Sequence, residues 1–254
     1  MHSTADGGAH DGAHEGPAAA RWERLAPGVA RRRLPGWDAT AGVAAGASGV
    51  LVVDTGSSLR EGAEIRREAE ELCGRRVTHI ALTHPHFDHV LGTAAFAGVR
   101  VYGAAGLAEA LSRGREELRA DAVRHGADPR AAAEACELLV RPGHEVAGEL
   151  TLDLGGGVRA LLAAVGPGHT AHDLAVLVTG TGGPAVLFCG DLVEESGEPQ
   201  AGPDALPARW PATLDRLLAL GGEDALYVPG HGAVVDARFV REQRAVLAAR
   251  YGEG

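Results

Sequence analysis

A six-residue stretch of the chain holds four side chains that can bind metal. It reads HPHFDH over residues 84–89 and directly follows the apolar run 77–83. Imidazole nitrogens and carboxylate oxygens are common ligands of hydrolytic metal ions. The first two histidines, two residues apart on a turning segment, can face one ion. The aspartate and histidine that follow can then face a neighbouring ion, so the spacing predicts a metal site.

The apolar runs of the chain indicate how this stretch is held. The run 77–83 is short, partly β-branched and followed by a proline, which predicts a buried strand that opens into a loop. The run 50–53 is wholly apolar and predicts a central strand of a sheet covered on both faces. Asp54 lies at its carboxyl end, where open α/β sheets place their chemistry.

Three more candidate ligands lie far along the chain, and each directly follows a glycine. A glycine lets the backbone adopt unusual dihedral angles and approach an ion closely. Together the seven candidates are His84, His86, Asp88, His89, His169, Asp191 and His231. Seven is the number that two ions need if each takes three ligands of its own and one carboxylate bridges them. Such a pair, about 3.5–4 Å apart, polarises a substrate and generates hydroxide at neutral pH.

Other segments predict the surrounding elements. Ser57 or Ser58 can cap a helix that runs to Cys73. A short helix is expected over about 90–97, and two or three short helices over about 104–139, as a lid or as a packing layer. The strand before Asp191 is expected to end there, with a polar loop over 194–209. Residues 1–20 offer almost nothing to bury and are expected to form a disordered tail before one domain over 21–254.

The composition limits the partners. The chain of 254 residues has a formal net charge of −10, which argues against nucleic acid or an anionic membrane as a partner. It contains no lysine and no asparagine, and its three cysteines are widely spaced, as in a reduced cytosolic protein. No signal peptide and no apolar run of membrane-spanning length is apparent. We therefore expect a cytoplasmic protein that acts on a small molecule.

These motifs, in this order, resemble the metallo-β-lactamase superfamily. The likeness covers about residues 22–251, including the strand that ends at Asp54. It implies an α/β fold, a four-layer αββα sandwich, with the helices over 104–139 as an insertion. It also implies that Asp191 bridges two metal ions and that Asp54 orients a ligand. The ligands it implies for the first ion are His84, His86 and His169. Those for the second are Asp88, His89 and His231.

The function that follows is a metal-dependent hydrolase. A hydroxide bound by two zinc ions would attack a small ester, lactone or thioester, and Asp88 would carry a proton to the leaving group. Iron or manganese could replace zinc at ligands of this kind.

Three alternatives remain open at this point. One is a mononuclear iron oxygenase, similar to persulfide dioxygenases, that fills a single site with His84, His86 and either Asp191 or His169. Another is a β-lactam hydrolase, which is disfavoured because Asp191 stands where the best-known zinc enzymes place a cysteine, and because their lysine and asparagine are missing. The third is a scaffold without activity. A glyoxalase II-like assignment is weakened by the short segment after His231.

Overall fold

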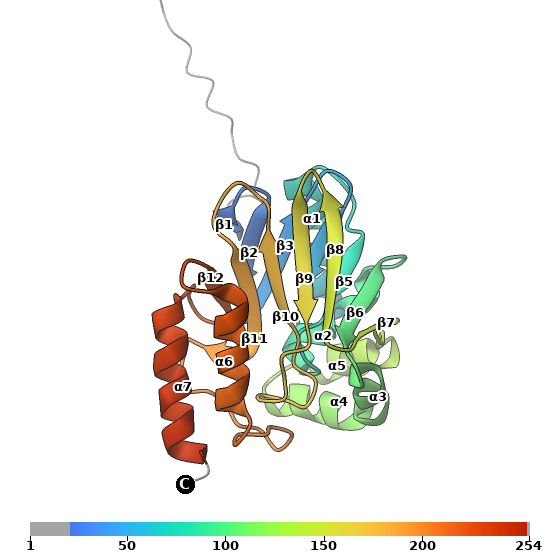
Figure 1. The fold of residues 1–254 in the computed structure, drawn as a ribbon. Coiled ribbons are helices and arrows are strands. Elements are labelled where there is room, and N and C mark those ends of the chain that lie inside the picture. The colour runs from blue at the N-terminus through green and yellow to red at the C-terminus, as the bar shows by residue number, and fades with distance from the viewer. Residues whose placement is uncertain (1–20, 253–254) are drawn as a thin grey trace, which may run out of the picture.

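Two β-sheets lie face to face, with helices on the outer side of each, in the computed structural model (Figure 1). The structure describes residues 21–252, so the tail expected over 1–20 lies outside the described residues. Three separate hydrophobic cores fill the spaces between successive layers. The prediction of a four-layer αββα sandwich is confirmed.

The first sheet has seven strands in the order of the chain. They are β1 (Glu23–Ala26), β2 (Val29–Arg33), β3 (Thr40–Ala45), β4 (Val50–Val53), β5 (His79–Ala81), β6 (Arg100–Ala104) and β7 (His144–Val146). The first four strands pair antiparallel, and β4 to β7 pair parallel. Since β4 and β5 are parallel neighbours, the residues that follow them, Asp54 and the 84–89 motif, leave the sheet at the same edge.

The second sheet has five strands in the order β12-β11-β10-β9-β8. They are β8 (Glu149–Gly155), β9 (Val158–Ala163), β10 (Ala175–Thr179), β11 (Val186–Glu194) and β12 (Leu226–His231). All pairs are antiparallel except β11 with β12, which is parallel. Asp191 lies within β11, and His231 ends β12.

The expectation that the strand ends at Asp191 was wrong. Strand β11 continues to Glu194, and its register against β12 shifts on both sides of Gly190. Gly190 has a φ of 55°, and a Cβ there would lie 2.8 Å from Thr83 Cβ. The bulge lets β11 pass close to the loop after β5, which brings Asp191 up to the histidine motif.

The helices are α1 (Leu59–Cys73), α2 (Phe87–Val90), the 3-10 turn η2 (Thr93–Ala95), α3 (Leu107–Arg113), α4 (Arg115–Arg124), α5 (Pro129–Glu137), α6 (Trp210–Gly221) and α7 (Ala237–Tyr251). Helix α1 has the expected Ser58 cap. The helix expected over 90–97 starts earlier, at Phe87, because His86 is extended and the Leu91 N–H already bonds the Phe87 carbonyl. Asp88 and His89 therefore stand in the first helical turn of α2.

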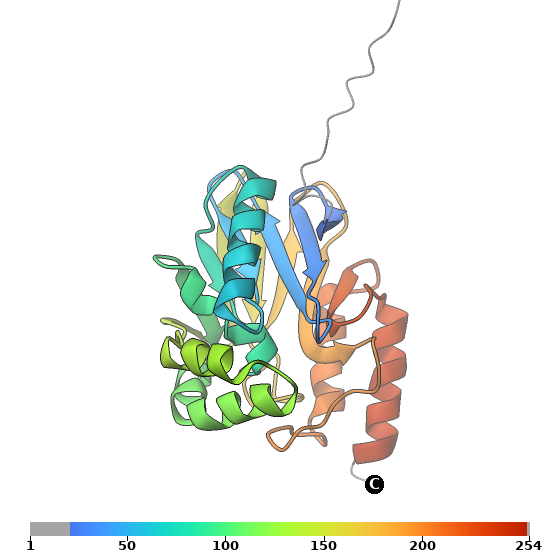
Figure 2. The same ribbon diagram turned by 180° about the vertical axis from the view of Figure 1, so that it is seen from behind.

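The three helices over 107–137 form a packing layer on the outer face of the first sheet, beside α1 (Figure 2). Buried Leu118, Ala122 and Cys136 share a core with Phe87 and Val90 of α2. Helix α4 packs against α2. These helices thus support the motif through the shared core, and a packing layer describes them better than a lid.

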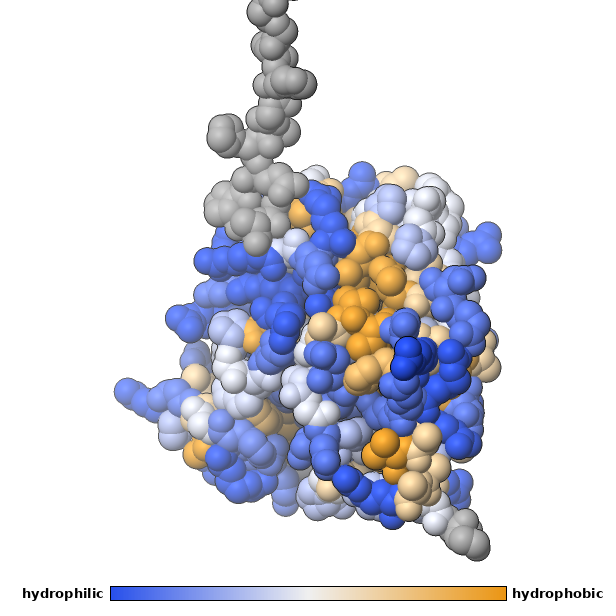
Figure 3. Space-filling model, turned by 90° about the vertical axis from the view of Figure 1, so that its left-hand side faces the viewer, coloured by the Kyte–Doolittle hydropathy of each residue, from blue (hydrophilic) through white to orange (hydrophobic). Residues whose placement is uncertain are grey.

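Helices α6 and α7 cover the second sheet. Trp210 and Leu214 of α6 and Val240 of α7 are buried against strand residues such as Leu187. On the side where β1 and β12 form the sheet edges, the surface is mostly polar, with a larger apolar patch in its upper half and a smaller one near its lower end (Figure 3). Among residues 21–252, no helix is long and apolar enough to cross a membrane.

A buried ion network ties the first strands to α1. Glu68, only 1% exposed, accepts hydrogen bonds from Trp22 Nε1 at 3.2 Å and from Arg32 at 2.8 Å. Arg21 also donates to it, at 3.0 Å. Arg32 is itself 5% exposed, so neither charge has water to replace its partner.

Removing the charge of Glu68 should therefore destabilise the fold strongly. We expect Glu68→Gln to lower the free energy of unfolding by about 3 kcal/mol, because buried Arg32 keeps only the more exposed Glu64, 3.6 Å away, as a countercharge. Urea unfolding followed by circular dichroism measures this. Glu71→Gln on the same helix is the control. Glu71 is 46% exposed and pairs with Arg67 at 3.7 Å, so its loss should cost less than about 1 kcal/mol. Equal effects of the two changes would contradict the role of the network.

Candidate metal centre

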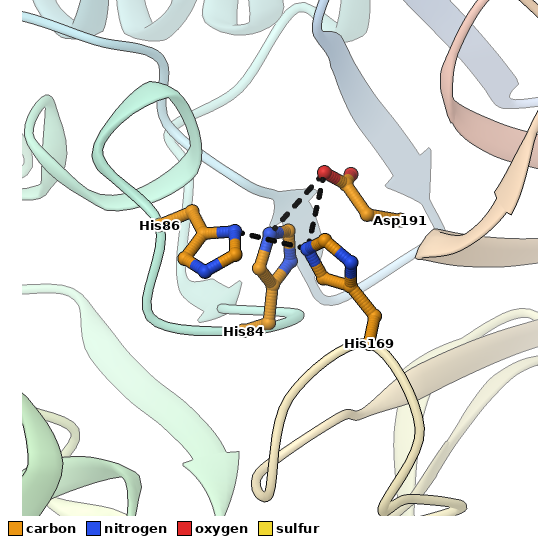
Figure 4. Close-up of side chains that lie close together, drawn as sticks. All are labelled: His84, His86, His169 and Asp191. Carbon is orange, nitrogen blue, oxygen red and sulfur yellow. Dashed lines mark hydrogen bonds and ion pairs between the residues drawn. The ribbon is translucent and has the colours of Figure 1, made fainter. Parts of the chain in front are cut away.

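The seven predicted ligands come together at one edge of the sandwich. Their ligand atoms fall into two groups, and within each group these atoms lie within 4.8 Å of one another. The first group, drawn in Figure 4, contains His84, His86, His169 and Asp191. The second contains Asp88, His89 and His231. The residues come from the loop after β5, from α2, from the loop before β10, and from β11 and β12.

Asp191 lies between the two groups. Its Oδ2 is 3.5 Å from Nε2 of both His84 and His169 in the first group. The same oxygen is 3.3 Å from His231 Nε2, and Oδ1 is 3.2 Å from His89 Nε2, in the second group. One carboxylate therefore reaches histidines of both groups, as a bridging ligand would.

Asp54 orients one histidine of each group. Its Oδ2 accepts from His89 Nδ1 at 2.9 Å and from the Thr83 hydroxyl at 2.7 Å, while Oδ1 accepts from the Thr83 N–H. Because the Thr83 hydroxyl gives its only hydrogen to Asp54, it must accept from His84 Nδ1, 2.9 Å away. Both histidines thus carry hydrogen on Nδ1 and turn Nε2 toward the centre.

Backbone carbonyls orient two further histidines. His169 Nδ1 donates to the carbonyl of Gln200 at 3.1 Å, and His231 Nδ1 donates to that of Trp37 at 2.8 Å. A carbonyl oxygen can only accept, so these imidazoles also hold hydrogen on Nδ1 and present Nε2 to the centre.

His86 is oriented the other way round. Its Nδ1 faces the centre, 2.9 Å from His169 Nε2, and its Nε2 lies 3.1 Å from Asp204 Oδ2. Asp204 and Thr83 were missed in the sequence. Thr83 directly precedes the motif and could have been suspected, but Asp204 lies 118 positions beyond His86 with no pattern around it.

The charges of the centre compensate one another when no cation is bound. Burial lowers the pKa of His169 to about 4 and also depresses that of His84. Burial acts in the same direction on His89 and His231, but nearby carboxylates, chiefly Asp191, outweigh it. They raise the pKa of His89 well above its usual value and that of His231 to about 9. Burial would raise the pKa of Asp191, yet the surrounding histidines hold it well below its usual value.

Several polar atoms of the centre lack hydrogen-bond partners. Within residues 21–252, four buried side-chain nitrogens or oxygens have none, and three of these are His84 Nε2, His89 Nε2 and Asp191 Oδ1. Leaving such atoms buried and unpaired is costly. A divalent cation would use these lone pairs and replace the extra protons on the histidines, so the donor set fits a metal.

The neighbouring polar residues have structural contacts. Asp173 accepts from the N–H and the hydroxyl of Thr170 at 2.9 and 2.7 Å, which shapes the loop that carries His169. The ring of His172 contacts the Ala105 carbonyl at 3.0 Å. Cys189 is buried in the core under α6 and α7.

Three comparisons place the chain among known proteins. A family model described as the metallo-beta-lactamase superfamily matches residues 34–231. A hydroxyacylglutathione hydrolase from Acidiphilium cryptum (strain JF-5) is 32% identical over 192 residues. This match covers 73% of the chain and 65% of the relative, so it spans just under two thirds of that protein.

Solved structures share the fold. The metallo-beta-lactamase FIM-1 from Pseudomonas aeruginosa, in its mono-zinc form, superimposes with a TM-score of 0.65 at 20% identity, over 90% of this chain and 94% of that one. The metallo-beta-lactamase DIM-1 gives 0.68 at 16% identity, over 91% and 97%. At such low identity these likenesses establish the architecture alone.

The hydrogen bonds of Asp54 predict that it supports both groups. Asn tolerates the positive φ of 57° at this position about as well as Asp, so Asp54→Asn should fold. It loses the carboxylate oxygen that accepts from His89 and Thr83. We expect zinc affinity to fall roughly 10- to 100-fold for both ions, measured by competition with a chromogenic chelator.

Variants of Thr83 separate the effect of Asp54 on the first ion from its effect on the second. Thr83→Val should weaken the first ion alone, and Thr83→Ser, which keeps the hydroxyl, should bind zinc as the wild type does. Unchanged affinity for both ions in Asp54→Asn would show that the centre does not depend on this carboxylate.

Proposed function

We propose that this chain, which belongs to the metallo-β-lactamase superfamily, hydrolyses a small acyl thioester with two bound zinc ions. Both the hydrolase activity and the choice of a thioester belong to this proposal. The observation that carries it is the 32% identity to a hydroxyacylglutathione hydrolase. That likeness supports the substrate class even though the sequence alone had weakened the glyoxalase II-like assignment.

The ligand assignment is also a proposal. His84, His86 and His169 would hold the first ion, while Asp88, His89 and His231 would hold the second, with Asp191 between them. Mixed imidazole and carboxylate donors suit zinc. The second group has three converging ligands of its own, two of them buried. This supports two metals over the single iron of an oxygenase.

The proposed reaction would use both the metal ions and a proton that Asp88 carries. Bound as proposed, the ions would make water a nucleophile at neutral pH and polarise the thioester carbonyl. Asp88 Oδ2 lies 3.4 Å from His231 Nε2 and 3.6 Å from His89 Nε2. Asp88 would take the proton of the attacking water and deliver it to the sulfur as the C–S bond breaks. The products are a carboxylic acid and a thiol.

The ligand shell would keep bulk water out of this step. His84 and His89 are at most 1% exposed, and Asp88 is 7% exposed. His86 and His231 are more open, at 26% and 12% of their side chains. Substrate would therefore approach from the side of His86 and His231.

A β-lactam substrate has weaker support. The solved β-lactamases share the fold at 16–20% identity, which says nothing about substrate. The chain has no lysine to pair with a drug carboxylate and no asparagine to hold an oxyanion.

A cytoplasmic location remains a prediction from the three free cysteines.

Elemental analysis and a substrate panel test this function. Purified chain loaded with zinc and passed over a desalting column should keep two zinc ions. It should cleave S-lactoylglutathione faster than p-nitrophenyl acetate, a chromogenic cephalosporin or bis-p-nitrophenyl phosphate. One iron per chain with oxygen consumption would instead support the oxygenase, and cephalosporin turnover above that of the thioester would overturn the substrate class.

Asp88→Ala should remove the proton carrier. We expect kcat to fall about 10²- to 10⁴-fold, as is typical for loss of a general acid–base group, with part of the loss due to weaker binding of the second ion. Assays at saturating zinc separate the two contributions. Full turnover by a folded Asp88→Ala protein would exclude Asp88 from the reaction.

A further inference from the structure

We infer that Asp204 is a positioning residue. It determines which nitrogen of His86 faces the metal centre, and thereby the zinc affinity of the first group of ligands. This inference rests on the metal binding in the proposed function. His86 presents Nδ1 to the centre, whereas the other four histidines present Nε2. Asp204 Oδ2 is the acceptor, at 3.1 Å, that holds the opposite nitrogen of His86.

A partner that can only accept a hydrogen bond fixes the hydrogen of His86 on one ring nitrogen. A carboxylate oxygen can only accept, so Nε2 of His86 must carry a hydrogen, and Nδ1 is the nitrogen left to ligate a cation in the centre. Without that partner, both tautomers and both ring orientations of His86 become available. The negative charge of Asp204 also makes the imidazole a stronger donor to a cation.

The segment that carries Asp204 is fastened to the centre at several points. The Gln200 carbonyl holds His169, a buried histidine of the first group. The Leu206 N–H donates to the Gly168 carbonyl at 2.9 Å, next to His169. At the opposite end of the segment, Glu198 pairs with Arg250 of α7 at 2.9 Å. Asp204 is thus held against His86 by backbone contacts on both sides.

The effect should be confined to the first group. His89 is oriented by Asp54, and His231 by the Trp37 carbonyl, and Asp204 takes part in neither bond. Asp204 is 45% exposed and His86 26% exposed, so water can replace part of the lost interaction. The expected loss therefore lies at the lower end of the range seen for partners of metal-bound histidines.

Zinc titration of three variants tests the inference. Against a chromogenic chelator, the wild type should bind two zinc ions per chain. Asp204→Ala should bind one as tightly as the wild type and the other roughly tenfold more weakly. Asp204→Asn keeps an oxygen that accepts from Nε2 and should recover much of that affinity. Glu198→Gln, which alters the same segment without touching a histidine, should bind both ions as the wild type does.

A spectroscopic readout separates positioning from a general loosening of the loop. In ¹⁵N spectra of the zinc-loaded histidine rings, His86 should show a coordinated Nδ1 and a protonated Nε2 in the wild type. Asp204→Ala should show a mixture of ring states for His86 alone. Two zinc ions at unchanged affinity in Asp204→Ala, or a weakening equal to that in Glu198→Gln, would overturn the inference. A wild type that binds no zinc would instead refute the proposed function on which it rests.

Discussion

The buried polar atoms of the candidate metal centre are the constraint on which this structure depends. His84 Nε2, His89 Nε2 and Asp191 Oδ1 are buried without hydrogen-bond partners. A fold keeps such atoms only if something else satisfies them, because each costs free energy comparable to a lost hydrogen bond. Protons on His89 and His231 offset the charge of Asp191 in part. Two divalent cations would satisfy the remaining lone pairs.

The direction of the strands in the sandwich brings these buried polar atoms together. Parallel β4 and β5 deliver Asp54 and the 84–89 motif to one edge of the first sheet. Parallel β11 and β12 deliver Asp191 and His231 to the same edge of the second. The bulge at Gly190 closes the distance between the sheets, since any side chain there would meet Thr83. The cores between the layers fix these edges relative to one another.

The sequence predicted the ligands better than it predicted what holds them. Histidine and aspartate after apolar strands are visible as types and spacing, and Asp54 stood out at the end of β4. The structure brings all seven candidates together, although their roles as ligands remain predictions. The start of α2 at Phe87 and the extension of β11 to Glu194 were missed, because neighbouring strands and helices set those boundaries.

The remaining supports carry little signal in a single sequence. Trp37 and Gln200 act through backbone carbonyls, which every residue possesses, so their residue type says nothing about the contact. Asp204 is one acidic residue in a polar loop, and only the folded chain places it at His86. Residue types therefore reveal side chains that could bind a cation. The contacts that determine which histidine nitrogen faces the centre are visible only in the folded chain.

Anomalous diffraction at the zinc edge, from crystals grown with zinc, tests the two-metal account most directly. The account predicts two peaks about 3.5–4 Å apart, one against Nδ1 of His86 and the other against Nε2 of His89, with Asp191 between them. A single peak, or two peaks that leave Asp191 outside their coordination, would contradict it.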